Sequence, residues 1–416
     1  MSQSDQALSD QKLSDQKLPE RNTSTATIMS PGTVHLEALP PLSIYVHIPW
    51  CVRKCPYCDF NSHEAREDIP ESAYIDALIS DLESTLPSVW GRTVHSIFIG
   101  GGTPSLLAPE SIERLLLALR ARVMLLPDAE ITLEANPGTV EAARFDGFRT
   151  AGVTRLSVGV QSLNAQHLRA LGRIHDVPQA QAAIEAARSC FENINVDLMY
   201  ALPDQTLEQA LSDVRGVLEY APQHVSAYHL TIEPNTYFHR YPPQLPDHDA
   251  AAEMQQAIES LLASHGYDHY ETSAFAQPGH RCRHNLNYWQ FGDYLGIGAG
   301  AHSKLSFPDR ITRQMRYKQP SEYLRRMVAG EAIQTSNVVP ANDLPVEFMM
   351  NALRLTNGVE RRMFSERTGL PITAVTTRLA QAVEAGLLVD SAERLRATLK
   401  GQRFLNDLLA LFVEST

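Results

Sequence analysis

Three cysteines within eight residues are the part of this sequence that points most directly to chemistry. Cys51, Cys55 and Cys58 follow the pattern C-x3-C-x2-C, and no fourth cysteine lies nearby. A structural zinc ion prefers four ligands and a disulfide joins two thiols, so three thiols match neither directly. A 4Fe–4S cluster is usually held by four thiolates, and with only three from the protein one iron keeps an open position. The spacing therefore predicts a cluster that can bind a substrate at iron, as a catalytic zinc does.

A zinc site is the alternative that ligand counting leaves open. His47 or His63 would complete a tetrahedral site with the three cysteines. Arg53 and Lys54 lie between the first two cysteines and would offset the negative charge of a thiolate-bound cluster. The cysteine spacing therefore predicts a metal centre. Whether it is a 4Fe–4S cluster or a zinc site depends on the residues around it.

Polar residues also follow several later apolar runs. Residues 100–105 read GGGTPS, where glycines let the backbone approach a ligand and Thr103 and free N–H groups can bind a carboxylate or an amino group. Glu134, Gln161 and Asp197 lie on or just beyond other runs. A carboxylate at a strand end can hold ribose hydroxyls. Singly each would be an ion pair or a strand-end cap, whereas together they predict a ligand site.

Six apolar, β-branched runs would position these groups. They are residues 43–48, 94–99, 130–135, 153–160, 194–201 and 224–231. Amphipathic segments such as 71–86 and 206–220 lie between them, which predicts repeated βα units around a parallel sheet. Six units are too few for an eightfold barrel. The fold class is therefore α/β, as a partial (β/α)6 barrel or a doubly wound sheet, with chemistry at the carboxyl ends of the strands.

Four parts are expected along the chain. Residues 1–40 are a disordered leader with three SDQ(A/K)L repeats, and residues 41–240 are the partial barrel. Residues 241–340 extend the barrel and include a helix at 248–266. Residues 341–416 form a helical, winged-helix-like domain with a hairpin near 386–399. This last part holds nine basic and nine acidic residues, so it has no basic footprint for nucleic acid.

Composition excludes several further classes. The 416 residues carry a net charge of −12, which disfavours a general binder of nucleic acid or anionic membranes. No run of about 18 apolar residues occurs, and no secretory signal begins the sequence. Five cysteines, three of them clustered, favour a reducing cytoplasm. Of the other two, we expect Cys190 to be a small buried residue and find no partner for Cys282.

The cysteine spacing, with Tyr57 directly before the last cysteine, resembles that of the radical S-adenosylmethionine enzymes. In that superfamily the methionine amino and carboxylate groups chelate the open iron. An electron from the reduced cluster then cleaves the sulfonium to a 5′-deoxyadenosyl radical. The resemblance implies that the glycine run binds methionine and that Arg173 can pair with its carboxylate.

The strand-end residues narrow the resemblance to the oxygen-independent coproporphyrinogen III oxidase group, over residues 43–416. It implies a cofactor shell made of Tyr45, Tyr57, Gly101, Gly102, Thr103, Glu134, Gln161, Arg173 and Asp197. The oxidase branch decarboxylates two porphyrinogen propionates and has a further cysteine where this chain has Phe60. The other branch, the haem chaperones, has a signature that resembles H-N-x-x-Y-W, and residues 284–289 read HNLNYW.

The chaperone branch implies the function that we expect: binding haem and passing it to a respiratory apoprotein, which can itself be membrane-associated. The 4Fe–4S cluster and S-adenosylmethionine would support a homodimer or the transfer step, so the chain need not be an enzyme. Coproporphyrinogen III oxidation is the alternative, and a zinc or interaction protein is a third hypothesis. His284 is the expected haem ligand beside the flat faces of Tyr288 and Trp289, and His302 is a second candidate.

Overall fold

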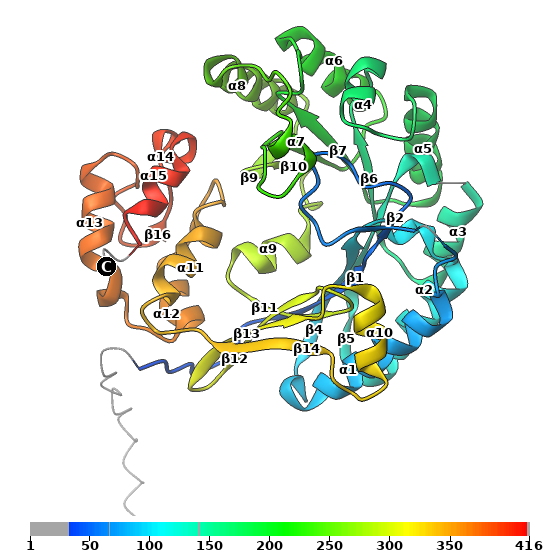
Figure 1. Cartoon of the computed structure of the whole chain (residues 1–416). Helices are drawn as coiled ribbons and strands as arrows, with labels where there is room; N and C mark the ends of the chain where they lie inside the picture. The colour runs from blue at the N-terminus through cyan, green and yellow to red at the C-terminus, as the bar shows by residue number, and fades with distance from the viewer. Residues whose placement is uncertain (1–32, 66, 140–141, 414–416) are drawn as a thin grey trace, which may run out of the picture.

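The computed structural model describes residues 33–65, 67–139 and 142–413, and its centre is one large mixed sheet (Figure 1). The sheet has 12 strands in the order β14-β13-β12-β11-β1-β4-β5-β6-β7-β8-β10-β9. Their bounds are β1 Leu42–Ile48, β4 Thr93–Gly101, β5 Met124–Ala135, β6 Arg155–Gln161, β7 Ile194–Tyr200, β8 His224–His229, β9 Asp268–Glu271, β10 Ala274–Ala276, β11 Asp293–Ile297, β12 His302–Phe307, β13 Arg310–Arg316 and β14 Ile333–Val338. Two short strands, β2 Trp50–Cys51 and β3 His63–Glu64, pair within the cysteine loop.

The six predicted strands are confirmed as β1, β4, β5, β6, β7 and β8, and neighbours among them pair in parallel. Helices cover the outer, convex face of the sheet (Figure 1). They are α1 Glu71–Val89, α2 Pro109–Arg122, α3 Ala142–Ala151, α5 Val177–Cys190, α6 Leu207–Leu218 and α8 His248–Ser264. Shorter elements are η1 Pro104–Leu106, η2 Pro137–Thr139, α4 Ala165–Ala170 and α7 Tyr237–Arg240. The predicted α/β partial barrel is thus the observed architecture.

Local sequence sets where two of the outer helices begin. Thr206 caps α6 by accepting the Gln209 N–H at 3.3 Å, while the Gln209 side chain accepts the Thr206 N–H at 2.9 Å. Asp176 and Gln179 form the same reciprocal capping box at the start of α5. Such boxes satisfy N–H groups that a helix end leaves unpaired, so each helix starts at a fixed residue after its strand.

The extension predicted for residues 241–340 supplies strands that the sequence did not reveal. β11 pairs in parallel with β1, and β12, β13 and β14 continue antiparallel from it. Helix α9, Arg283–Trp289, lies on the concave face, where the His284 ring packs against Phe98 with centroids 5.0 Å apart. Helix α10, Pro320–Met327, returns to the outer face beside α1. The HNLNYW segment is therefore a short helix inside the barrel.

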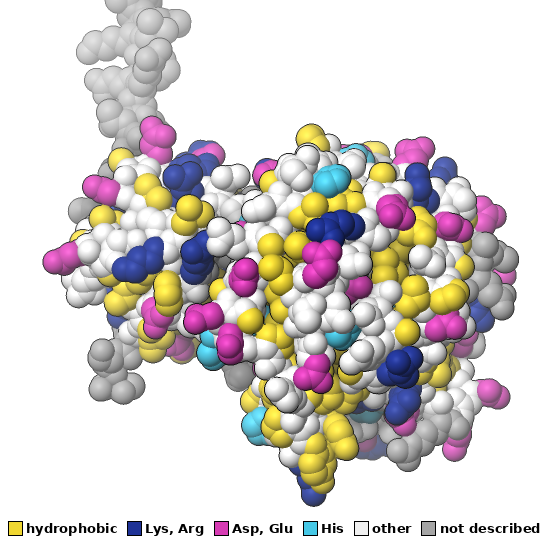
Figure 2. All heavy atoms as spheres, turned by 90° about the horizontal axis from the view of Figure 1, so that it is seen from above, with side chains coloured by type: hydrophobic (Ala, Val, Ile, Leu, Met, Phe, Trp, Pro, Cys, Tyr) yellow, Lys and Arg dark blue, Asp and Glu magenta, His cyan; other side chains and the backbone are white. Residues whose placement is uncertain are grey.

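The C-terminal region has its own apolar core. Its helices are α11 Leu344–Ala352, α12 Met363–Thr368, η3 Ile372–Val375, α13 Thr376–Glu384, α14 Leu399–Arg403 and α15 Leu405–Ala410. The predicted hairpin is present as an antiparallel bridge between Leu388 and Ala397. In addition, β15 Val359–Glu360 pairs with β16 Arg394–Leu395. Figure 2 shows acidic and basic side chains mixed over the face of this region that it displays.

The boundary predicted at residue 40 for the disordered leader lies too far along the chain. Leu36 is buried in the C-terminal core, and the His35 N–H donates to the Gly369 carbonyl at 3.0 Å. Residues 33–40 therefore belong to the folded part, and the SDQ(A/K)L repeats lie outside the described residues. None of the described helices has the length and apolarity needed to cross a bilayer.

One buried carboxylate ties the barrel to its extension. Asp81 on α1 accepts from the Arg316 guanidinium at 3.2 Å, and neither side chain is exposed. The same carboxylate accepts from the Tyr323 hydroxyl and from the Gly298 N–H, both at 3.0 Å. A buried charge is tolerated only when it is paired and hydrogen-bonded, and Asp81 meets both conditions.

Asp81→Ala should lower the free energy of unfolding by about 3–5 kcal/mol, because Arg316 would stay buried without its partner. Asp76→Ala is the matched control, since Asp76 lies on the same helix in an exposed pair with Arg114 and should cost at most about 1 kcal/mol. Urea unfolding followed by circular dichroism measures both. Equal losses in the two variants would show that burial of the Asp81 pair does not matter.

Candidate functional site

The three predicted cysteines open into one cavity of about 380 Å³ on the concave side of the barrel. Eight residues of the predicted cofactor shell also line it: Tyr57, Gly101, Gly102, Thr103, Glu134, Gln161, Arg173 and Asp197. Most of these residues lie at the carboxyl ends of the parallel strands, the edge where α/β folds place ligands. Tyr45 and His284 are not among the lining residues.

The cysteine loop is closed by its own backbone and by one lysine. The His63 N–H donates to the Pro49 carbonyl at 2.7 Å, and the Ala65 N–H to the Cys51 carbonyl at 2.9 Å. The Lys54 ammonium donates to the Phe60 carbonyl at 3.1 Å across the loop. Lys54 therefore holds the loop closed, in addition to the charge it brings, while Arg53 lines the cavity as expected of a countercharge.

The two histidines that would complete a zinc site are engaged elsewhere. His47 Nε2 donates to the Asn61 carbonyl at 2.9 Å, and its Nδ1 then accepts from the Tyr45 hydroxyl at 3.1 Å. His63 Nε2 donates to the Asn61 side-chain oxygen at 3.3 Å. Among the described residues no three His, Cys, Asp or Glu side chains gather around a single-ion position. Asn61 thus accepts a hydrogen bond from each of the two imidazoles.

An arginine and a threonine contact the thiols. Arg173 donates to Cys55 Sγ at 3.5 Å and to the Gly159 carbonyl at 2.8 Å, while its Nε has no partner among the described residues. Burial raises the pKa of the Cys51 thiol, and a hydrogen bond with Thr103 partly opposes this shift. Buried thiols need positive charge or metal to ionise, so these residues fit a negatively charged thiolate cluster.

The glycine motif behaves differently from the expectation. Its N–H groups are not free, because Gly102 donates to the Ile48 carbonyl and Thr103 to the Trp50 carbonyl, both at 2.7 Å, and Gly101 donates to Glu134 at 3.0 Å. A Cβ at Gly102 would lie 2.4 Å from the Trp50 oxygen. The glycines are needed for this close packing against the cysteine loop, and these three N–H groups are already paired within the protein.

Two acidic side chains, Glu134 and Asp197, line the same cavity. Burial and then the charge of Asp197 raise the pKa of Glu134 to about 7, and burial raises the pKa of Asp197. Asp197 accepts from Ser157 at 3.0 Å and from Asn195 at 2.8 Å. Both carboxylates open into the cavity. They can accept hydrogen bonds from ligand hydroxyl groups, as strand-end carboxylates do in nucleotide sites.

Gln161 ends β6 in a strained backbone conformation, with φ at +70°. A non-glycine residue held in this region is often found at a ligand site. A Cβ at Gly159 would lie 3.1 Å from Gln161 Nε2 and 3.6 Å from an Arg173 nitrogen. The bare backbone of Gly159 therefore lets both side chains enter the cavity.

Residues that the sequence did not single out complete the lumen. Arg155 and Ser157 alternate on β6, and Asn195 alternates with Asp197 on β7, so all four side chains face the cavity. The Arg155 Nε is buried without a partner among the described residues. Polar residues at every second position of an otherwise apolar strand were the available signal. The unpaired Nε atoms of Arg155 and Arg173 mark a cavity suited to a polar ligand.

The HNLNYW helix is fixed at its start. Glu130 of β5 accepts the N–H groups of Arg283 and His284, each at 3.2 Å. Burial lowers the pKa of His284 to about 3, and its Nδ1 pairs with the Ser96 hydroxyl at 3.2 Å. His284 is thus a neutral imidazole buried against the Phe98 and Tyr45 rings, and its predicted role as a haem ligand stays a prediction.

Comparison with known proteins matches two families. Residues 45–215 match the Radical SAM superfamily, and residues 339–404 match the HemN C-terminal domain. The chain is 50% identical over 381 residues to the heme chaperone HemW of Haemophilus influenzae, covering 90% of this chain and 98% of that protein. It is 48% identical over 377 residues to the heme chaperone HemW of Escherichia coli, covering 90% and 99%.

Among solved structures, the chain resembles the coproporphyrinogen III oxidase HemN of Escherichia coli, a radical SAM enzyme. The TM-score is 0.76 at 25% identity, over 90% of each chain. This likeness covers the barrel, its extension and the C-terminal helices. The fold is therefore a radical SAM barrel. The residues that line its cavity fit the 4Fe–4S cluster and the S-adenosylmethionine that this fold implies.

The raised pKa of Glu134 predicts a pH dependence of stability in the ligand-free protein. Glu134 holds its proton up to about pH 7 in the folded state but loses it near 4.5 when unfolded. The folded state therefore binds more protons between these values, and stability should fall as pH rises through this window. Glu134→Gln should flatten the fall and stabilise the protein at pH 8, measured by thermal unfolding. Glu113→Gln, exposed on α2, is the control, and a parallel profile for Glu134→Gln would refute the assignment.

Proposed function

We propose that this chain, which belongs to the heme chaperone HemW family of radical SAM proteins, binds haem and transfers it to a respiratory apoprotein. A 4Fe–4S cluster and S-adenosylmethionine would accompany haem in this function. The observation that carries the proposal is the identity with heme chaperone HemW over nearly the whole length of that relative. Phe60, in place of a further cysteine, and the HNLNYW helix support it.

Cys51, Cys55 and Cys58 would hold the cluster. The cluster, when bound, supplies an open iron for S-adenosylmethionine and an electron for cleaving its sulfonium. Arg173 lies 3.5 Å from Cys55 Sγ and would stabilise a thiolate there. The Tyr57 side chain of the cysteine loop packs near Phe238, with ring centroids 6.4 Å apart. Lys54 keeps the loop closed around the site.

The remaining shell would orient S-adenosylmethionine. Arg173 would pair with the methionine carboxylate, and the carbonyls of Gly101 and Gly102 would accept from the amino group. Glu134 and Asp197 would accept from the ribose hydroxyls. Gln161, in its strained conformation at the end of β6, would direct its side-chain amide toward S-adenosylmethionine. Tyr45 lies behind the lining, where its hydroxyl fixes the tautomer of His47 and so the position of Asn61.

Haem would be bound through a histidine, with His284 and His302 as the candidates. The recipient would be a respiratory apoprotein, soluble or membrane-associated, and a homodimer would be the assembly for transfer. We place this function in the cytoplasm, because three free thiols and a cluster require a reducing compartment.

Oxygen-independent oxidation of coproporphyrinogen III is the second candidate. The likeness to the HemN oxidase over 90% of each chain favours it. So does the cofactor shell that the resemblance to the oxidase group implies. Position 60 argues against it, since the Phe60 side chain is 59% exposed at the cavity and cannot act as the oxidase branch's further cysteine.

Cys51→Ala, Cys55→Ala and Cys58→Ala should each abolish the visible absorbance of the 4Fe–4S cluster in anaerobically reconstituted protein, because each removes one of only three thiolates. Cys190→Ala is the matched control, since Cys190 lies away from the cavity and should keep a full cluster. Iron and sulfide are measured together. Zinc without sulfide in the wild type would replace the cluster with a zinc site.

The choice between chaperone and oxidase is tested in one reaction. Reduced, reconstituted protein is incubated with S-adenosylmethionine and coproporphyrinogen III, and porphyrins and 5′-deoxyadenosine are separated by chromatography. We expect no decarboxylated product, while the same protein binds haem and passes it to an apoprotein acceptor. The Escherichia coli oxidase serves as the positive control. Protoporphyrinogen from this chain would establish the oxidase function instead.

A further inference from the structure

The haem function proposed above leaves the iron ligand open, and the two candidate histidines differ in access. The His284 ring is buried between Tyr45 and Phe98, and its Nδ1 is paired with Ser96. A porphyrin could reach it only if α9 left its place. His302 begins β12, is exposed, and makes no side-chain hydrogen bond to the described residues.

The His302 imidazole has the form that binds iron. Partial burial, followed by the nearby charges of Lys318 and Arg313, lowers the pKa of His302. It is therefore neutral at neutral pH, and metals bind the neutral ring. Haem brings four nitrogens of its own, so one protein side chain can complete a site that a bare metal ion could not use.

The backbone beneath His302 is held rigidly. The Gly300 N–H donates to the Tyr317 carbonyl, and the Arg316 N–H to the Ala301 carbonyl, both at 2.9 Å. A Cβ at Gly296 would lie 2.0 Å from the His302 oxygen, so only glycine fits beside it. The backbone that carries His302 is therefore fixed in position, which is what a binding site needs of the element that supports its ligand.

The same loop touches the cysteine loop. Asn61 donates to the Ala299 carbonyl at 3.0 Å and to the Lys318 carbonyl at 2.9 Å. His302 lies close enough to His47 that a charge on one ring lowers the pKa of the other. A ligand on His302 would thus lie at the edge of the cysteine loop. His302 does not line the cavity, so the cavity stays open to S-adenosylmethionine.

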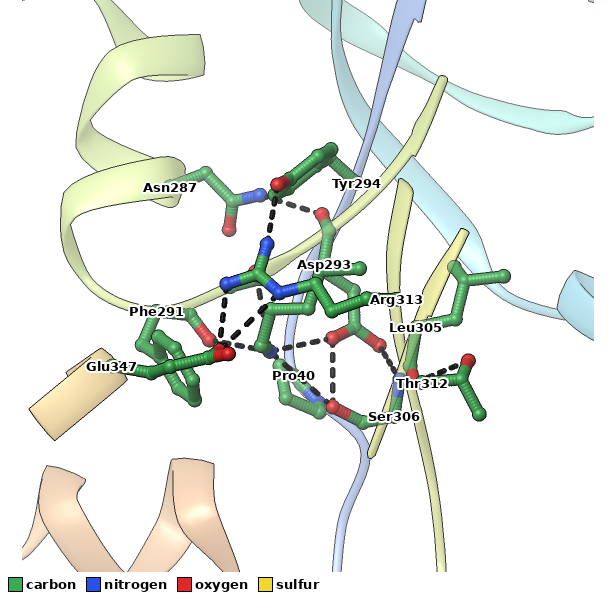
Figure 3. A network of polar contacts seen from close by, with 12 residues as sticks. Pro40, Asn287, Phe291, Asp293, Tyr294, Leu305, Ser306, Thr312, Arg313 and Glu347 are labelled. Atoms are coloured by element: carbon green, nitrogen blue, oxygen red, sulfur yellow. Dashed lines mark hydrogen bonds and ion pairs between the residues drawn. The ribbon is translucent and has the colours of Figure 1, made fainter. Parts of the chain in front are cut away.

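The surroundings of His302 suit a macrocycle with acidic groups. Met315 is its direct partner on β13, so the two side chains share one face about 4.5–5.5 Å apart at Cβ. Arg313, on the same face, is already engaged by the Tyr294 hydroxyl at 2.5 Å and by Glu347 at 2.8 Å (Figure 3). Lys318 is exposed and forms no ion pair within the described part of the chain. It is the cation left for a carboxylate.

We propose, on the basis of the haem function above, that His302 is the axial ligand of haem bound on the concave face of the β12–β13 hairpin. Met315 packs against the macrocycle or coordinates the haem iron through its sulfur, as methionine thioethers do in haem proteins. Lys318 pairs with a propionate. Haem and S-adenosylmethionine then occupy adjacent sites on either side of the cysteine loop and do not compete.

The test is a haem titration of the full chain, followed by Soret absorbance and electron paramagnetic resonance. His302→Ala should bind haem at least about tenfold more weakly, since loss of a ligand costs no less than loss of a group that orients one. Free imidazole should restore the wild-type spectrum, and the variant should keep its cluster and its affinity for S-adenosylmethionine. His95→Ala, exposed on β4, is the matched control.

The role of Lys318 is tested with haem and its dimethyl ester. Lys318→Met should weaken haem binding about two- to fivefold, the value of an exposed ion pair, and leave the ester unaffected.

Each contrary result has one meaning. Unchanged haem binding by His302→Ala, or a loss confined to His284→Ala, would overturn the assignment while leaving the haem function intact. A wild-type chain that binds no haem would overturn both. Competition between haem and S-adenosylmethionine would place haem in the cavity and remove it from the hairpin.

Discussion

The parallel register of β1 between β4 and β11 is the constraint on which the site depends. Ile48 at the end of β1 pairs with Gly101, so the cysteine loop leaves the sheet directly beside the glycine motif. On the other side Tyr45 pairs with Gly296, which brings the His302 loop to the same edge. One strand thus sets the thiols, the glycines and the candidate haem ligand side by side, although they are far apart in sequence.

The cavity holds acidic and basic side chains that are shielded from water and affect one another's charge. Glu134 and Asp197 both have raised pKa values because they are buried, and Arg155 lies close enough to oppose those shifts. Arg155 and Arg173 each keep a buried nitrogen without a partner among the described residues. Such groups are costly unless something completes them. A polar ligand that offers hydroxyl groups and a carboxylate would give hydrogen-bond partners to the acidic side chains and to the arginines at once.

Features that depend on local sequence were predictable. Continuous apolar runs located the six parallel strands, and the spacing of three thiols located the cavity. Long-range partners were not: the Asp81–Arg316 pair spans 235 positions. The Gly102 N–H is taken by the Ile48 carbonyl of β1, and the Gly101 N–H by the Glu134 side chain of β5. The strands β11 to β14 were missed because polar, charged and glycine residues interrupt their apolar pattern. Pairing forms them rather than propensity: β11 pairs with β1, and β12, β13 and β14 each pair with the strand before.

The pairing of β1 with β11 also sets an order of events during translation. Ser43 pairs with Tyr294, about 250 residues later, so at roughly 5–20 residues per second the ribosome delivers the partner some 12–50 s after β1. Through that interval one edge of the first strand is bare while the rest of the parallel sheet can assemble against its other edge. A nascent chain of this fold therefore carries an open β-edge for most of its synthesis, and shielding it until β11 emerges falls to whatever meets the chain at the ribosome.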